Sequence, residues 1–324
     1  MYRKGNILDK NLIHCMNKLS DEESNKLKFR AIRNEEGVTC RHCGGKDHYW
    51  QKTIWMYECK KCKTRTTLRS GTVMQASKLP FRFWFITMHM LTSTKKPFSS
   101  LELQRQLGHK FYEPIWYMIQ KLRKKMGIRD GEFQLDKIVE LDDGFFEDID
   151  TELSKEEKPI KLKRGRGSQK QSKVIVMAST VHTLNAPKKH KKQTKFRYVK
   201  MLVVDNLKSA TIQEKVEQNI QKGSLVKSDN YKGYTNIKEL VWSHQPKTVK
   251  PKEAAKVLPW VHTMISNAKR NLLGIHHMFS KRYHQDYLDM FCCKVNRRYM
   301  GDLLFDRLLF ACASNNYKKF IHVS

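Results

Sequence analysis

Four cysteines, arranged in two pairs, are the first residues whose spacing indicates chemistry. Two residues separate Cys40 from Cys43 and Cys59 from Cys62, and 15 residues lie between the pairs. Each Cys-x2-Cys turn presents two thiolates from one tight bend, and four thiolates complete a tetrahedral zinc site. The intervening residues are too polar for a core and alternate in polarity over 49–57, which is typical of a small β-hairpin. The sequence therefore predicts a zinc ribbon with one structural Zn²⁺, because a closed four-ligand site leaves no position for a substrate.

Aspartates that follow apolar runs form the second candidate site. Asp142 and Asp143 follow the run at 138–141, and Asp229 follows the run at 224–226. Carboxylates that a sheet brings together at strand ends can hold Mg²⁺, which keeps several waters and needs only one or two protein carboxylates plus phosphate oxygens. Three other aspartates compete for this role: Asp148, Asp150 and Asp205. Asp205 also follows an apolar run, but the residue after it indicates a turn.

The elements that must position these aspartates occupy the second half of the chain. Three β-rich runs are close enough in sequence to form a meander: 137–147, 173–181 and 196–204. After them the pattern predicts a helix, two short strands and three closing helices: 209–220, 224–229, 238–244, 253–274, 282–299 and 301–312.

A helical module is predicted between the ribbon and the β-rich runs. Ser99 or Ser100 can cap a first helix, and a second helix over 113–126 has a basic end that includes Lys121 and Arg123. Two helices joined by a Gly-containing turn, the second of them basic, fit a reader of the DNA major groove. A plain three-helix packing unit with a solvated basic end fits the same pattern.

The charge of the chain narrows the class of partner. Lys and Arg number 63 against 32 Asp and Glu, which gives +31 over 324 residues. An excess of this size indicates a polyanion partner, most often nucleic acid, although a generically basic surface gives the same count. Two segments concentrate the charge: 155–173, with Arg164 and Arg166 around a Gly-Arg-Gly loop, and 188–200. Both are interpreted either as phosphate contacts or as solvated charge runs.

Membrane and secreted classes are disfavoured. No apolar run approaches the roughly 20 residues that span a membrane, and residues 1–10 lack the apolar core of a secretory signal. The cysteines outside the two pairs do not suggest a disulfide framework. The expected compartment is therefore the reducing cytoplasm, with the protein at the nucleoid.

A series of motifs along the chain carries a resemblance to a known family. In order, they are TCRHCGG, YECKKCKTRTTLRSGTVM, SSLELQRQLG, VELDDGFFE, KRGRGSQKQSKVIVM, VKSDNYKGY, WVHTMISNAKRNLLGIHHMFSKRYHQDYLDMF and NRR. From about Gly37 to Arg298 the chain resembles bacterial insertion-sequence transposases of the ISXO-like type, with an N-terminal zinc ribbon and a DDE-like core. The resemblance implies an RNase H-like fold of the α+β or α/β class, in which helices flank a mixed sheet on both sides. It also implies cleavage of DNA at transposon ends and joining of the freed 3′-hydroxyl to target DNA.

The resemblance also implies the site residues. Asp142 is the first catalytic carboxylate and Asp229 the second, and Asn267 takes the third position, where DDE enzymes usually have Glu. Lys269 is the alternative third residue and a candidate DNA contact, but it lies about 200° around a helix from Asn267. His262 is expected to be a packed or solvated side chain.

These assignments give an expected organisation and mechanism. The segments are an N-terminal helical segment, the zinc ribbon, the helix-turn-helix-like module, the RNase H-like core with a basic insert at 155–173, and a closing helix and tail: 1–36, 37–72, 78–128, 133–300 and 301–324. Two Mg²⁺ ions held by Asp142 and Asp229 would assist an in-line phosphoryl transfer. The partners would be double-stranded DNA, at the terminal inverted repeats and at the target, and further copies of the chain on that DNA. The alternative is a catalytically inactive or co-opted sequence-specific DNA-binding protein.

Overall fold

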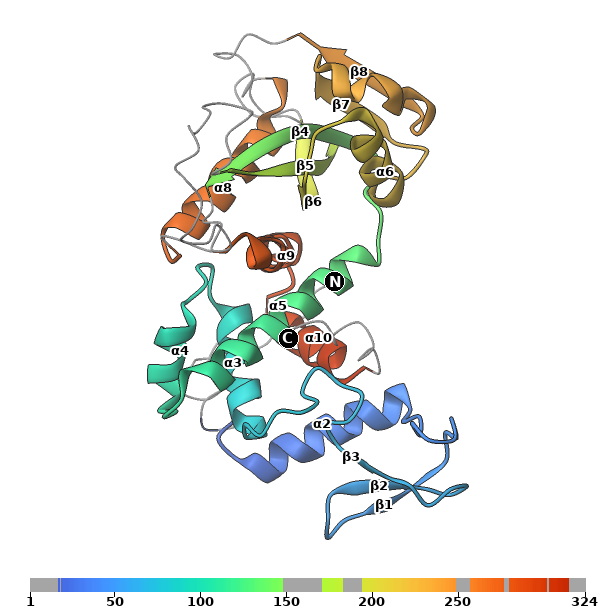
Figure 1. Cartoon of the computed structure of the whole chain (residues 1–324), viewed down its shortest axis with the longest axis vertical. Coiled ribbons are helices and arrows are strands. Elements are labelled where there is room, and N and C mark those ends of the chain that lie inside the picture. The colour runs from blue at the N-terminus through green and yellow to red at the C-terminus, as the bar shows by residue number, and fades with distance from the viewer. Residues whose placement is uncertain are drawn as a thin grey trace, which may run out of the picture. The chain divides into compact units, whose positions relative to one another are not determined.

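The computed structural model describes residues 17, 19–147, 171–182, 194–248, 257–276, 280–301 and 303–314. The chain forms two compact units: unit 1, residues 1–125 with 299–324, and unit 2, residues 126–298 (Figure 1). Arg164 and Arg166, with most of the predicted basic insert, lie outside the described residues. Within the described ranges, no helix combines the length and apolar character that a membrane crossing requires.

Unit 1 begins with a helix that supports the ribbon. The ribbon is an antiparallel sheet of β1 (His48–Gln51), β2 (Met56–Cys59) and β3 (Arg65–Thr67). It packs on α2 (Glu22–Glu36), where the hydroxyl of buried Tyr57 donates a hydrogen bond of 2.9 Å to Asn34. The expected hairpin corresponds to β1 and β2, and β3 adds a third strand.

Four helices complete unit 1: α3 (Phe81–Ser93), α4 (Ser100–Leu107), most of α5 (Tyr112–Gly131) and α10 (Leu303–Ala313). Ser99 caps α4, because its Oγ accepts a hydrogen bond from the backbone N of Glu102 at 3.0 Å. Gly108 ends α4 in the left-handed conformation at φ 61°. α10 packs against α2 and α3, and an ion pair of 2.9 Å joins Lys28 to Asp306. The last helix, α10, is thus part of unit 1. Its apolar stripe in the sequence shows that it is buried but does not show which unit it packs against.

Unit 2 is built on a five-stranded mixed sheet. Its strands are β4 (Ile138–Glu147), β5 (Gln171–His182), β6 (Thr194–Val204), β7 (Leu225–Asp229) and β8 (Ser243–Lys247). Their order is β6-β5-β4-β7-β8; the first three form an antiparallel meander, and β7 and β8 run parallel to β4. This is an RNase H-like topology, so the predicted fold class is confirmed. The strand expected at 238–244 begins only at Ser243, because the end of η3 (Lys232–Glu239) and the turn over 240–242 occupy the preceding residues.

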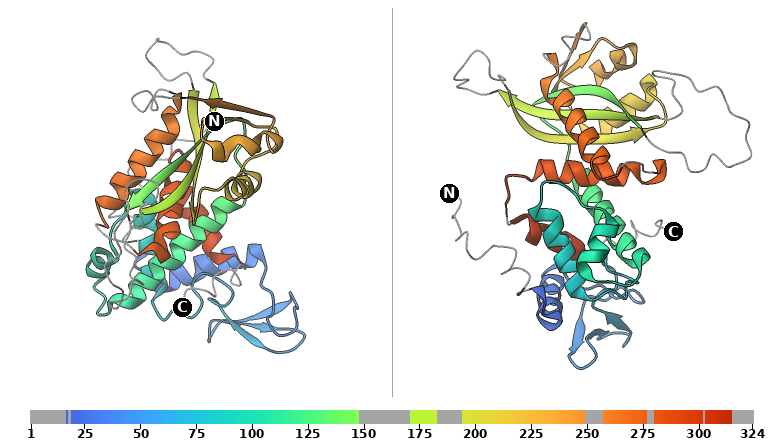
Figure 2. Two further views of the ribbon diagram at one scale, coloured as in Figure 1. Left: turned by 45° about the horizontal axis from the view of Figure 1, so that its top comes forward. Right: turned by 90° about the vertical axis from the view of Figure 1, so that its left-hand side faces the viewer.

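Helices cover both faces of this sheet. On one face, Val174 and Val176 pack with residues of α8 (Pro259–Leu273) and α9 (His284–Asn296), and the short η4 (Lys281–Tyr283) leads into α9. On the other face, Ile175 and Met177 pack with residues of α6 (Ser209–Asn219) and η3. The right-hand view of Figure 2 shows α8, in orange, lying across the strands. The strict alternation of β5 therefore separates two apolar cores, one on each face.

Side-chain amides of α9 close one edge of the sheet. Gln285 accepts a hydrogen bond from the backbone N of Val203 (2.8 Å) and donates one to the carbonyl of Met201 (2.9 Å). Asn296 likewise accepts from the N of Val199 (2.7 Å) and donates to the carbonyl of the same residue (2.9 Å). These bonds occupy outward backbone groups of β6, the edge strand. The opposite edge strand, β8, contains a proline at position 246, which has no backbone N–H to offer.

Candidate active site

Asp142 and Asp229 lie side by side on neighbouring parallel strands, Asp142 in the middle of β4 and Asp229 at the end of β7. The expectation that Asp142 ends its strand is wrong, because pairing with β5 continues β4 to Glu147. β4 and β7 pair with Leu141 opposite Ser228, so the next residue on each strand brings Asp142 beside Asp229. Neighbouring strands lie about 4.8 Å apart. Both aspartates are partly exposed. The fold therefore brings the two carboxylates that the sequence singled out to one point on the sheet.

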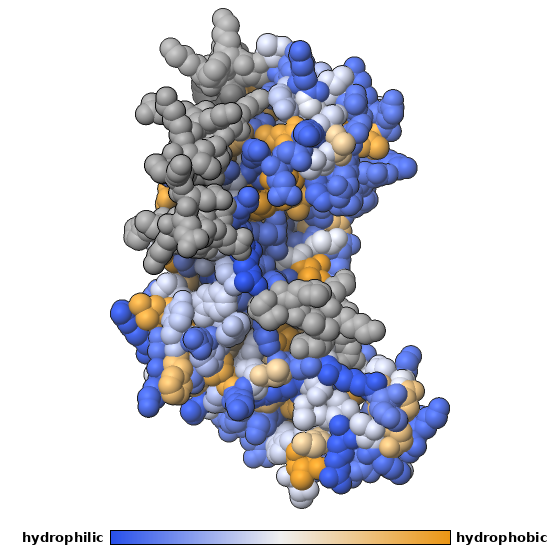
Figure 3. All heavy atoms as spheres, in the orientation of Figure 1, coloured by the Kyte–Doolittle hydropathy of each residue, from blue (hydrophilic) through white to orange (hydrophobic). Residues whose placement is uncertain are grey.

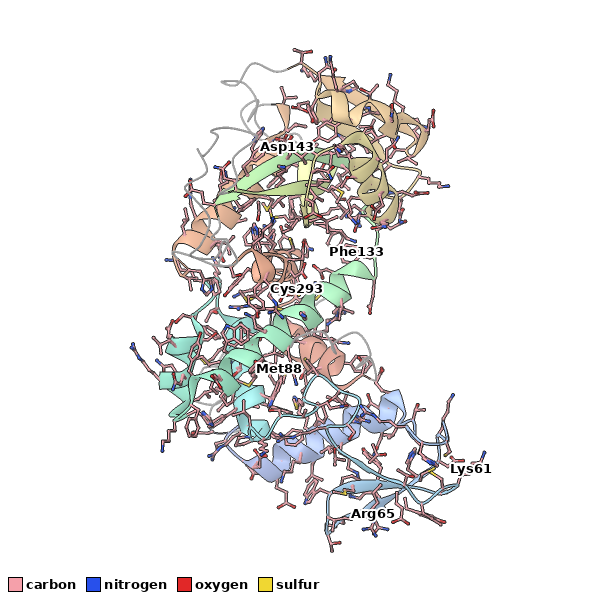
Figure 4. The ribbon with its side chains drawn as sticks, in the orientation of Figure 1. Lys61, Arg65, Met88, Phe133, Asp143 and Cys293 are labelled. Carbon is pink, nitrogen blue, oxygen red and sulfur yellow. The ribbon has the colours of Figure 1, made fainter. Side chains whose placement is uncertain are left out.

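Asp143, labelled in Figure 4, is the next residue of β4 and therefore lies on the opposite face of the sheet from Asp142, the face that η3 covers. Its backbone N donates to Asp142 Oδ1 at 2.8 Å, and its own Oδ1 accepts a hydrogen bond from the Tyr234 hydroxyl at 3.3 Å. Burial raises the pKa of Tyr234 well above its usual value, and the charges of Asp143, Asp142 and Asp229 add to the effect. Tyr234 therefore keeps its proton and acts as a donor that orients Asp143.

α8 brings His262 to the other side of the same carboxylates. His262 Nε2 lies 3.5 Å from Asp142 Oδ2, and 31% of the His262 side chain is exposed. Burial lowers the pKa of His262, while the negative charge of Asp229 acts in the opposite direction. The expectation of a merely packed or solvated His262 missed this contact, since the sequence does not show which helical face meets β4.

Glu140 on β4 fixes the start of α8. Its Oε2 accepts hydrogen bonds from the backbone N of Trp260 (2.8 Å) and of Val261 (3.0 Å). These are N–H groups that an N-cap side chain normally satisfies, and the N-cap residue here is Leu258, which has no acceptor. Glu140 is 4% exposed, so a buried carboxylate from a distant strand takes over the capping role.

From this start, α8 follows β4 in the same direction. His262 lies near Asp142, and Ile265 lies against Gly144, where an added Cβ would be 3.5 Å from Ile265 Cγ1. Further on, Lys269 Nζ lies 5.6 Å from the centroid of the Phe146 ring. The way α8 packs along β4 thus determines which α8 side chains lie near Asp142.

The structure does not bring Asn267 to this point. Asn267 is exposed and lies five positions after His262, which corresponds to about 140° of rotation and about 7.5 Å along the helix. Lys269 lies about 10.5 Å beyond His262 along the axis. The third catalytic position at Asn267, or at Lys269, therefore stays a prediction from the resemblance.

The ribbon cysteines form a compact cluster of four sulfurs. The Sγ atoms of Cys40 and Cys62 are 3.5 Å apart, as are those of Cys43 and Cys59, and all four lie within 4.8 Å of one another. Hydrogen bonding by Thr64 lowers the pKa of Cys62 to about 5, which favours the thiolate that metals bind. The cluster could hold one zinc ion.

The two halves of the cluster share one backbone design. The N of Gly44 donates to the carbonyl of Cys40, and the N of Lys63 donates to the carbonyl of Cys59, each at 3.0 Å. Gly44 and Lys63 both have positive φ, 71° and 60°. Among the residues that the structure describes, this is the only group of three or more Cys, His, Asp or Glu whose ligand atoms all lie within 4.8 Å of each other. Asp142, Asp229 and His262 are thus more widely spaced.

Two predicted DNA contacts in α5 are engaged within the protein. The Arg123 side chain is 0% exposed, and Lys121 Nζ donates to the carbonyl of Gln75 at 2.6 Å. Burial also lowers the pKa of Lys121. Side chains held in this way are not presented to a DNA groove, so the structure does not support the groove role of either cation. The exposed large aromatic side chains of α5 lie instead in its first two turns, at Tyr112 and Tyr117.

Comparison with known proteins identifies the family. Residues 134–296, which are 163 of the 324 residues, match the family model of the ISXO2-like transposase domain. The chain belongs to this family, and it is a DNA transposase of the polynucleotidyl-transferase type in the DDE superfamily.

Solved structures show only distant likeness. The crystal structure of the Mos1 mariner paired end complex with Mn has 12% identity, covers 70% of this chain and 76% of that chain, and gives a TM-score of 0.32. The crystal structure of a pre-cleavage Mos1 transpososome has 10% identity, coverages of 67% and 75%, and a TM-score of 0.28. The family assignment rests on the sequence match and not on these scores. No curated protein matches the chain.

Proposed function

We propose that this transposase binds the terminal inverted repeats of an insertion sequence, cleaves the DNA at those ends and transfers the freed 3′-hydroxyl to target DNA. The observation that carries the proposal is the strand register that brings Asp142 beside Asp229. Two carboxylates on adjacent parallel strands, both partly exposed, are a suitable donor set for hard divalent cations.

Asp142 and Asp229 would hold two Mg²⁺ ions. Bound there, the ions would supply charge stabilisation for the attacking and leaving oxygens of an in-line displacement. The chain's own residues prepare the site. Tyr234 orients Asp143, and Glu140 fixes α8, so that the carboxylates keep their places on the sheet.

DNA binding is assigned to the charge of the chain and to unit 1. The excess of 31 positive charges suits a phosphate backbone, and the face shown in Figure 3 is largely hydrophilic where the residues are described. In the ribbon, Lys60 and Lys63 lie 5.2 and 5.5 Å from the centroid of the exposed Tyr49 ring. Further contacts are assigned to α4 and α5 and to the basic segments. We propose that several copies act together on the DNA, at the nucleoid in the cytoplasm.

The test is cleavage of a labelled transposon-end duplex, with DNA binding measured separately. Asp142→Asn and Asp229→Asn should each reduce cleavage by more than about 1000-fold, because a centre built to stabilise developing charge loses a ligand. Binding should stay within about twofold, since phosphate contacts lie elsewhere. The matched control is Asp205→Asn, an exposed aspartate just after β6, which should cleave normally.

Two outcomes would refute the proposal. Full cleavage by Asp229→Asn would remove the two-carboxylate centre. A wild-type chain that binds end DNA but never cleaves it, with Mg²⁺ or Mn²⁺, would instead indicate a co-opted DNA-binding protein.

A further inference from the structure

We infer that His262 Nε2 is a third ligand of the divalent cation held at Asp142, and that this nitrogen gives the centre a preference for Mn²⁺ over Mg²⁺. The inference rests on the proposed function, because it adds a side chain to the centre of Asp142 and Asp229. It adds His262 to the centre and leaves the predicted role of Asn267, an exposed residue of α8, as a separate question.

The spacing of the two atoms fits two ligands of one ion. Ligand atoms at about 2.1 Å from a metal lie about 3.0 Å apart in octahedral geometry and about 3.4 Å apart in tetrahedral geometry. His262 Nε2 and Asp142 Oδ2 are 3.5 Å apart. The separation is long for a strong hydrogen bond, which is usually 2.7–3.2 Å for nitrogen and oxygen. Small rotations of the side chains would bring both atoms to an ion, and Asp229 approaches from the neighbouring strand.

The position of His262 is built into the fold. Glu140 holds the N–H groups of Trp260 and Val261, the two residues before His262, so the rotation of α8 at this point is fixed from β4 itself. Glu140 and Asp142 are two residues apart on one strand and therefore point to the same face. The same strand thus supplies a carboxylate ligand and anchors the helix that carries the imidazole.

The ligand type predicts the metal preference. Mg²⁺ prefers oxygen ligands and retains its waters, whereas imidazole suits first-row transition metals. An aspartate pair with one histidine should therefore bind Mn²⁺ more tightly than Mg²⁺. Removing the imidazole should weaken Mn²⁺ binding strongly and Mg²⁺ binding little.

The experiment measures the ligand directly, in the full chain with its ribbon cysteines loaded with zinc. Mn²⁺ is added at one equivalent, and pulsed electron paramagnetic resonance records coupling between the Mn²⁺ electron spin and a directly bound ¹⁴N. Wild type should show this coupling, and it should be lost in His262→Ala and in His262→Gln, which keeps a polar side chain of similar length. Both variants should bind Mn²⁺ at least about tenfold more weakly, since even partners of metal ligands affect affinity by 10–100-fold. Arg270→Gln, an exposed position of the same helix, is the control and should match wild type.

Thermal unfolding of each variant separates loss of the ligand from loss of the fold. Mn²⁺ binding that needs Asp142 and Asp229 but shows no ¹⁴N coupling would overturn the role of His262 and leave the proposed function standing. Coupling of ¹⁴N to Mn²⁺ that persists in both His262 variants would also overturn the role of His262 and leave the proposed function standing. Mn²⁺ binding that is unchanged in Asp142→Asn and Asp229→Asn would overturn the inference and the two-carboxylate centre together.

Discussion

Replacing Glu140 should release the start of α8 while leaving the sheet intact. Glu140→Ala removes the acceptor of two hydrogen bonds, and the backbone N of Val261, a fully buried residue, loses its partner. Loss of a helix cap costs about 0.5–2 kcal/mol, and an unsatisfied buried donor costs about 1–3 kcal/mol. We therefore expect Glu140→Ala to lower the free energy of opening of α8 by about 2–4 kcal/mol. Glu140→Gln keeps an oxygen acceptor and loses only the charge at the helix N-terminus, so it should cost about 1 kcal/mol.

Hydrogen exchange of a peptide that covers 257–273 measures this opening directly. The matched control is Glu147→Ala, at the exposed end of the same strand, which should change exchange by less than about 0.5 kcal/mol. Equal protection of α8 in Glu140→Ala and in wild type would show that the helix start is held by something else. Equal opening of α8 in Glu140→Gln and Glu140→Ala would refute the reasoning as well. The side-chain oxygen that Glu and Gln have in common would then contribute nothing to holding the helix start.

Two further predictions concern the ribbon and α9. The purified chain should contain one zinc, and Cys40→Ser should lose it together with amide protection over 37–68, because the strands of this ribbon are only three or four residues long and the metal site would link its two knuckles. Metal analysis and hydrogen exchange decide this, and a zinc-free chain with a protected ribbon would contradict it. Burial raises the pKa of Asp289 in α9 to about 7, so between about pH 4 and pH 7 the native state keeps a proton that the unfolded state has lost. Stability should therefore fall as pH rises through this window, by at most about 4 kcal/mol. Asp289→Asn should remove that slope in urea denaturation series at several pH values, and an unchanged slope would contradict the assignment.

The sequence was most informative where chemistry depends on local spacing. The two Cys-x2-Cys pairs predicted the ribbon, and each pair proves to lie on a knuckle with the same backbone hydrogen bonds. The apolar runs predicted the meander and the strand that ends at Asp229, but β4 continues past Asp142 to Glu147. Both features depend on a few consecutive residues, and so they can be read from the chain before it folds.

The sequence was least informative where one segment is positioned by another. Glu140 caps a helix that begins about 120 residues later, and no sequence pattern around either segment predicts such a contact. The direction in which His262 and Asn267 point depends on where α8 begins and how it lies on β4, and an error of one residue rotates every side chain by about 100°. The sequence pattern assigned Arg123 to the basic end of a helix, but the structure buries its side chain. Which cations stay exposed depends on how the helices pack, and the local sequence does not determine that packing.

The closed edges of the unit 2 sheet bear on how copies of the chain can associate. Copies gathered on one DNA meet at high effective concentration, and unpaired strand edges under such conditions join one another and lead to aggregation. Here Gln285 and Asn296 already occupy four outward backbone groups of β6, and β8 carries Pro246 and the exposed Lys247 at the opposite edge. Strand-to-strand addition between copies is therefore hindered at these positions of both edges.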